Sequence, residues 1–279
     1  MRVAARLGVF IAIILSTSAV GIAQWVRYPT AGIPRKADGT PDLNAPAPKL
    51  ADGKPDLSGI WRGNPRRCVG KDGQAAPCGV EIGGSPLGGN LGRDLPGGLP
   101  YQPWAAETAQ KRRADLSRDD PHVRCMPDNP PRTWTLPHLT KLIHTPKLLV
   151  LLYEVNAQYR QIFIDGRPFP EDPTPGWQGY SVGHWEGDTL VIETRGFRDG
   201  LWADTGGSPM SDAAKMTERL HRTNFGTMEL EITIDDPKVY TKPFTVKQTE
   251  YLEPDTEMID EFCVENEKSY ERMQRTRGQ

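Results

Sequence analysis

The chain has 279 residues, with 34 Lys and Arg against 36 Asp and Glu, which gives a formal net charge of −2 at pH 7. A balance so close to neutral gives no electrostatic reason to expect nucleic acid or an anionic membrane surface as a partner. No segment after the N-terminus reaches the roughly 18 consecutive apolar residues of a membrane helix, so we also expect no membrane insertion.

The N-terminus has the three parts of a secretory signal peptide. Arg2 and Arg6 give the first residues a positive charge, and an apolar run follows over residues 7–15. The small residues Gly21 and Ala23 then precede the expected cleavage point. The apolar run is too short to span a bilayer. We therefore expect residues 1–23 to be removed and the protein to be exported, to the periplasm or the medium. The alternative is a retained N-terminal anchor.

Four cysteines remain in a chain that is expected in an oxidising compartment, where bridged cysteines are the rule. Cys68 and Cys78 bracket a polar loop whose ends could meet, which leaves Cys125 to pair with Cys263. A metal site is the weaker interpretation, because neither CxxC nor a Cys/His ligand spacing occurs. We expect no metal and no cofactor.

Residues 24–100 form an arm rich in Pro and Gly, which cannot bury enough apolar surface to fold alone. The arm contains a turn phrase twice, "ADGTPDL" at 37–43 and "ADGKPDL" at 51–57. Asp-Gly favours a tight turn, and the following Pro keeps the chain extended before a leucine. We expect Leu43 and Leu57 to anchor the arm along the domain.

The next segment, residues 101–140, is expected to hold one helix and an irregular connection. Pro103 is compatible with a first helical turn, and good helix formers fill the stretch from Trp104 to Leu116.

Residues 141–265 have the pattern of an antiparallel β domain, followed by a polar tail at 266–279. Short runs of apolar, β-branched and aromatic residues alternate with two-residue turns, which favours hairpins. The strands are expected near 141–144, 148–155, 158–165, 179–185, 188–195, 215–224, 227–235, 243–252 and 257–263. About eight such strands close into an up-and-down barrel or fold into a sandwich. Two long insertions interrupt the pattern, and such insertions often carry binding groups.

Two resemblances bear on the fold and the family. The Gly59-x-Trp61 phrase, in a first strand expected near 58–63, resembles the opening of lipocalin-like barrels, where the indole closes one end against a basic side chain. With the downstream strands, it favours a mainly β, up-and-down, lipocalin-like barrel. The phrases "PDLSGIW", "YRQIFIDGRPFP" and "GYSVGHWEGDTLVIET" resemble a large family of exported bacterial proteins without an assigned activity. That resemblance implies export and brings no reaction with it.

Charged residues on strand faces suggest a polar cluster inside the barrel. Alternation along residues 215–224 puts Glu218 and Arg222 on one face with apolar neighbours. The same reasoning for two other strands suggests that Arg160 and Glu193 also point into the barrel, towards Glu218 and Arg222. Buried charges must be paired or must face a wet cavity. The cluster is therefore either an ion network that fixes strand register or the polar part of a ligand site.

Aromatic residues supply the other half of a possible pocket. Tyr180, Trp185 and Trp202 lie in or beside the two long insertions, as does Trp177. Tryptophan and tyrosine with a few polar groups suit a planar or partly apolar ligand, although plain core packing is an equal alternative.

We therefore expect a barrel-mouth pocket that binds an aromatic, terpenoid or sugar-like small molecule. One alternative is a hydrolase, lyase or isomerase in which Glu218 or Asp204 acts as general acid or base. Another is an interaction protein that acts through its N-terminal arm. No nucleophile elbow, P-loop or dinucleotide fingerprint occurs in the sequence. The sequence leaves the ligand, the reaction and the oligomeric state open.

Overall fold

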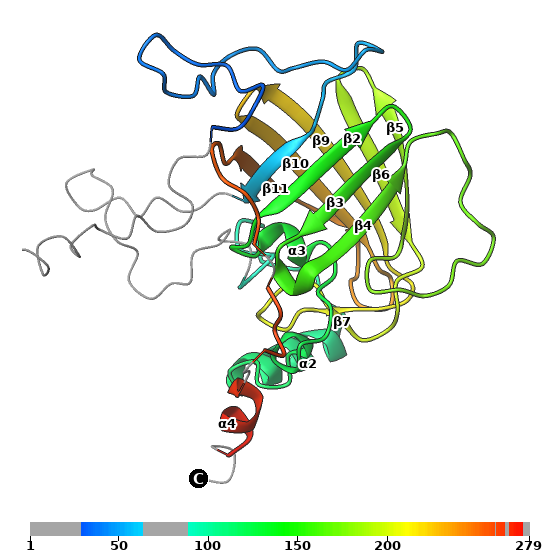
Figure 1. Cartoon of the computed structure of the whole chain (residues 1–279). Coiled ribbons are helices and arrows are strands. Elements are labelled where there is room, and N and C mark those ends of the chain that lie inside the picture. Colours follow the sequence, from blue (N-terminus) through cyan, green and yellow to red (C-terminus); the bar gives the residue numbers. More distant parts are fainter. Residues whose placement is uncertain (1–28, 64–88, 260, 266–267, 276–279) are drawn as a thin grey trace, which may run out of the picture.

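The computed structural model describes residues 29–63, 89–259, 261–265 and 268–275. The protein is mainly β, and nine strands close into a barrel (Figure 1), as the sequence predicts. These strands are β1 (Gly59–Gly63), β2 (Thr140–Thr145), β3 (Leu148–Tyr153), β4 (Gln158–Phe163), β5 (Tyr180–Glu186), β6 (Thr189–Arg195), β9 (Lys215–Asn224), β10 (Thr227–Asp235) and β11 (Phe244–Leu252). Each strand pairs with the next in chain order, and β11 returns to pair with β1.

One junction departs from the expected antiparallel order. The strands β4 and β5 run parallel and pair only at Ile162 with Ser181 and at Phe163 with Val182. The other eight junctions are antiparallel. A closed ring with an odd number of strands cannot alternate direction all the way round, so one parallel junction is unavoidable. We call the junction of β4 and β5 the seam.

Alternation of side chains explains how charged residues enter the interior. In β9 the residues Met216, Glu218, Leu220 and Arg222 are buried, and those between them are partly exposed. This is the face that the sequence predicts, because successive residues of a strand point to opposite sides of the sheet.

Trp61 and Arg222 close one end of the barrel. The indole of Trp61 is fully buried and donates its Nε1 hydrogen to the carbonyl of Leu57 at 3.0 Å. The guanidinium of Arg222 lies 4.9 Å from the centre of the Trp61 ring and donates to backbone carbonyls, including that of Asp56. The arrangement is the one that the resemblance to lipocalin-like barrels implies.

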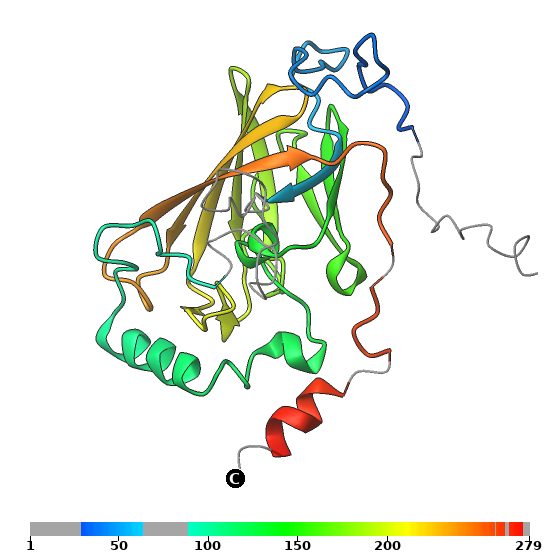
Figure 2. The same cartoon turned by 90° about the vertical axis from the view of Figure 1, so that its left-hand side faces the viewer.

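The described part of the arm before β1, residues 29–57, lies over this closed end (Figure 2). Its two turn phrases fold alike, since Gly39 donates to the carbonyl three residues before it at 2.9 Å and Gly53 does the same at 2.9 Å. The carbonyl of Leu43 accepts from Gly226 in the β9–β10 hairpin at 2.8 Å, and Leu57 is fully buried beside Trp61. Both leucines therefore anchor the arm, as predicted.

Helices and a small sheet occupy the opposite end. The helix α2 (Pro103–Ala114) is the one that the sequence predicts, and it lies far from residues 29–57 in both views (Figures 1 and 2). The short helix α3 (Arg132–Thr135) and the pair formed by β7 (Leu201–Trp202) and β8 (Pro209–Met210) were not predicted.

The C-terminal segment differs from the prediction. None of the described residues within 257–263 belongs to a strand, and α4 (Ser269–Arg275) forms in the segment expected to be a tail. The predicted Cys125–Cys263 disulfide is confirmed, with the two Cα atoms 5.4 Å apart. The predicted Cys68–Cys78 bridge and the signal peptide lie outside the described residues. In the described part of the chain, no helix has the length and apolar character needed to cross a membrane.

Candidate functional site

An ion pair lies inside the barrel between β4 and β9. The guanidinium of Arg160 donates to both carboxylate oxygens of Glu218, at 2.9 and 2.5 Å. It also donates to the hydroxyls of Ser181 at 3.1 Å and Thr194 at 2.7 Å. Both charged residues are almost completely buried. Burial lowers the pKa of Arg160, but the charge and hydrogen bonds of Glu218 outweigh it and raise that pKa above its ordinary value.

Trp134 of α3 completes this network from the end of the barrel opposite residues 29–57. Its indole donates to Glu218 at 2.6 Å, and its carbonyl accepts from the side chain of Gln248 at 2.6 Å. The hydroxyls of Tyr153 and Thr133 are buried here without a hydrogen bond of regular geometry. Sequence reasoning missed Trp134, because it lies in an irregular segment where no periodicity indicates a face.

A pocket lies next to the seam, beside the residues that precede Ile162 in β4 and Ser181 in β5. The pocket has a volume of about 600 Å³ and is lined by residues within 157–163 and 176–181 and by Pro127. We call it the seam pocket. Aromatic side chains line it, including Tyr159, Trp177 and Tyr180, and Arg160 also borders it.

Aromatic and amide contacts shape the walls of the seam pocket. The rings of Phe163 and Tyr180 stack with their centres 5.4 Å apart. Gln178 donates to the side-chain oxygen of Gln158 at 3.0 Å and to the carbonyl of Asp128 at 2.6 Å. Among the described residues, Nε2 of Gln158 and Oε1 of Gln178 have no hydrogen-bond partner. Both atoms are buried, so the two amides hold this wall together and present no free polar atom to the pocket.

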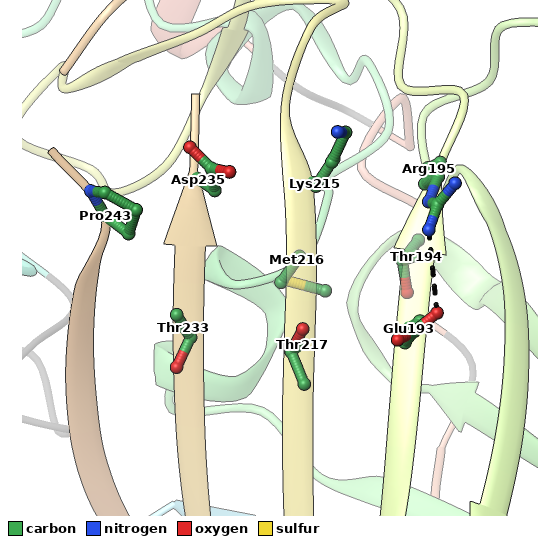
Figure 3. A pocket seen from close by; sticks show the side chains of 9 residues that line it. All are labelled: Glu193, Thr194, Arg195, Lys215, Met216, Thr217, Thr233, Asp235 and Pro243. Carbon is green, nitrogen blue, oxygen red and sulfur yellow. Dashed lines mark ion pairs between the residues drawn. The ribbon is translucent and has the colours of Figure 1, made fainter. Parts of the chain in front are cut away.

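The structure brings together only some of the predicted site residues. Arg160 and Tyr180 border the seam pocket, and Glu218 binds Arg160 from within the barrel. The prediction that Glu193 faces the interior is wrong, because β6 turns its neighbour Thr194 inward instead. Glu193 lies outside, 3.7 Å from Arg195, beside a separate pocket of about 300 Å³ (Figure 3).

The predicted aromatic walls lie at opposite ends of the barrel. Trp185 packs against His144, with ring centres 5.7 Å apart, and lies 5.8 Å from the ammonium group of Lys54 in the arm. Trp202 is buried at the other end, where the guanidinium of Arg112 lies 4.4 Å from its ring. The two tryptophans therefore do not wall one pocket. The seam pocket lies in the barrel wall and not at the mouth of the barrel.

The remaining predicted residues have structural contacts of their own. Arg222 belongs to the closed end and lies four residues from Glu218 along β9, about 13 Å at the usual rise of a strand. Asp204 is buried and accepts from the backbone of Leu91 at 2.9 Å and from the backbone and hydroxyl of Ser208 at 3.0 and 2.6 Å. These contacts hold two loops together and occupy both oxygens of Asp204.

A second interior carboxylate was not predicted. Glu250 of β11 is buried, and its side chain accepts a hydrogen bond from Gln248. No cation pairs with it among the described residues, and burial raises its pKa to about 8. Alternation with Val246 and Leu252, which are also buried, is the sequence signal that could have found it.

Comparison of the chain with protein-family models, with curated proteins and with solved structures gives no match.

Proposed function

We propose that this is an exported binding protein whose seam pocket holds a partly apolar small molecule. The observation that carries the proposal is the aromatic-lined hollow in the wall of an otherwise closed barrel, with the neutralised Arg160–Glu218 pair behind it. Its volume of about 600 Å³ is within the usual range for ligand pockets, about 300 to 1,000 Å³.

The chemistry of the pocket favours binding over catalysis. A general acid or base must reach the proton that it transfers. Both oxygens of Glu218 are engaged by Arg160 and Trp134, and those of Asp204 are engaged by loop groups. Rigid aromatic faces suit the recognition of a ligand that is apolar over most of its surface.

Export is part of the proposal and has indirect support. The Cys125–Cys263 disulfide favours a compartment outside the cytoplasm, because disulfides persist in oxidising surroundings. The signal-like N-terminal sequence points the same way.

Native mass spectrometry of the protein, purified from the periplasm or medium of its own host, tests the proposal. We expect a retained mass that is lost in the variants Trp177→Ala and Tyr180→Ala. The variant Tyr251→Ala, which removes an exposed tyrosine of β11, is the matched control and should keep the mass. A retained mass that is unchanged in both pocket variants would show that the seam pocket is not the binding site.

A further inference from the structure

We propose that the occupant of the seam pocket is a short extended peptide, which adds a strand to the open edge of β4. This inference rests on the proposed function and specifies the chemical class of its ligand. Its basis is the backbone of β4, whose edge towards the pocket is unpaired over residues 158–161.

The lower half of β4 has a strand partner on one side only. Residues 158–161 pair with β3, whereas pairing with β5 begins at Ile162. Within the described part of the chain, no backbone hydrogen bond joins residues 158–161 to β5. Peptide groups along a strand point alternately to its two neighbours, so about half of these groups face the pocket. Unpaired strand edges are ready templates for a further strand.

The direction of the chain fits one added strand along β4. Opposite residues 158–161 only Tyr180 belongs to β5, and residues 177–179 form no strand. The added strand would therefore pair with β4 alone and run antiparallel to it, as β3 does on the other side. Recognition would use the main-chain ladder for affinity and the pocket walls for side-chain selection.

The ends of the pocket limit the length of the peptide. The paired residues Ile162 and Phe163 close the seam at one end, and β4 begins at Gln158 at the other. The open edge of four residues, 158–161, corresponds to about 13 Å of strand. Alternate side chains of the peptide would face the buried Arg160, which Glu218 neutralises, so these positions should be small and uncharged. The others would face Tyr159 and Trp177 and should be apolar or aromatic.

Charge at the rim adds a further preference. The guanidinium of Arg198 lies 4.5 Å from the ring of Trp177 and has no ion-pair partner among the described residues. A carboxylate near Trp177, from an acidic residue or the peptide C-terminus, would complement it. A terpenoid or an aromatic hydrocarbon would leave both the strand edge and Arg198 unpaired, which disfavours these classes.

Selection from a phage-displayed library of random octapeptides, on the full-length exported protein, tests the proposal. We expect enriched peptides with alternating small and apolar residues and an acidic group. A synthetic enriched peptide should lose at least tenfold in affinity when alternate backbone nitrogens are methylated, because methylation blocks the strand ladder and keeps the side chains. The exposed variant Arg198→Gln should weaken binding of the acidic peptide several-fold, and Tyr251→Ala should not.

Hydrogen exchange supplies a second measurement that does not require an altered protein. Peptide binding should slow exchange of backbone amides within residues 158–161. Equal binding of the methylated and unmethylated peptides, or binding without this protection, would overturn strand addition. Failure to enrich any peptide dependent on Trp177, while native mass spectrometry still finds a ligand that requires Trp177, would overturn the peptide class and leave the proposed function standing. Loss of both would overturn both.

Discussion

Replacing Glu250 by Gln should stabilise the protein at neutral pH. The carboxyl group of Glu250 is buried inside the barrel without a cationic partner among the described residues, and burial raises its pKa from the ordinary 4.5 to about 8. The folded protein therefore retains a proton that the unfolded chain releases. Glutamine has nearly the same shape and can still accept the hydrogen bond that Gln248 donates.

The sign and size of the effect follow from proton linkage. Where the folded state binds one proton more than the unfolded state, the free energy of unfolding falls by about 1.4 kcal/mol per pH unit. For Glu250 this stability is fully present below pH 4.5, decreases as the pH rises towards 8, and changes no further above 8. At pH 7 the accumulated loss is about 3 kcal/mol, which Glu250→Gln should largely remove.

Urea unfolding followed by tryptophan fluorescence between pH 5 and 9 measures this difference. The variant should gain little at pH 5 and progressively more up to pH 8. Glu229→Gln, on the exposed face of the neighbouring strand β10, is the matched control and should change the free energy of unfolding by less than about 0.5 kcal/mol at every pH. A constant difference between wild type and Glu250→Gln across the pH range would refute the reasoning.

Three further changes test other parts of the structure. Arg160→Met should reduce the free energy of unfolding by about 3 to 5 kcal/mol, because it leaves Glu218 buried without its cation. The double change with Glu218→Leu should restore much of that loss in the same urea titration. Trp61→Ala should cost about 3 to 5 kcal/mol by removing a fully buried ring from the closed end, measured by chemical unfolding. Joint replacement of Cys125 and Cys263 by Ser should cost about 2 to 5 kcal/mol, and a reductant should destabilise the wild type alone.

Side-chain alternation could be predicted from the sequence wherever a strand is long and regular. The inward face of β9, with Glu218 and Arg222, follows directly from the period of two, and so does the burial of Arg160 in β4. The same method failed for Glu193, because β6 buries Val191, Ile192 and Thr194 and the apolar residues alone do not define one face.

The seam could not be predicted, because it depends on the number of strands. The sequence suggests nine strands from residue 141 onward and one near 58–63, whereas the barrel has nine strands in all because none forms at 257–263. A change of one strand changes the parity of the ring and decides whether a parallel junction exists. Trp134 could not be assigned either, since α3 has four residues and its contacts come from distant strands.

The buried ion pair lies directly behind the unpaired part of the seam. The sequence allowed two interpretations of Arg160 and Glu218, a network that fixes strand register and the polar part of a ligand site. Below Ile162 no backbone ladder holds β4 against β5, but the side chain of Arg160 reaches across to Ser181 of β5, Thr194 of β6 and Glu218 of β9. Side-chain bonds inside the barrel thus fix the spacing that backbone bonds leave undefined. A rigid network behind an open edge would keep that edge available to the ligand that we propose, so the two interpretations are compatible with each other.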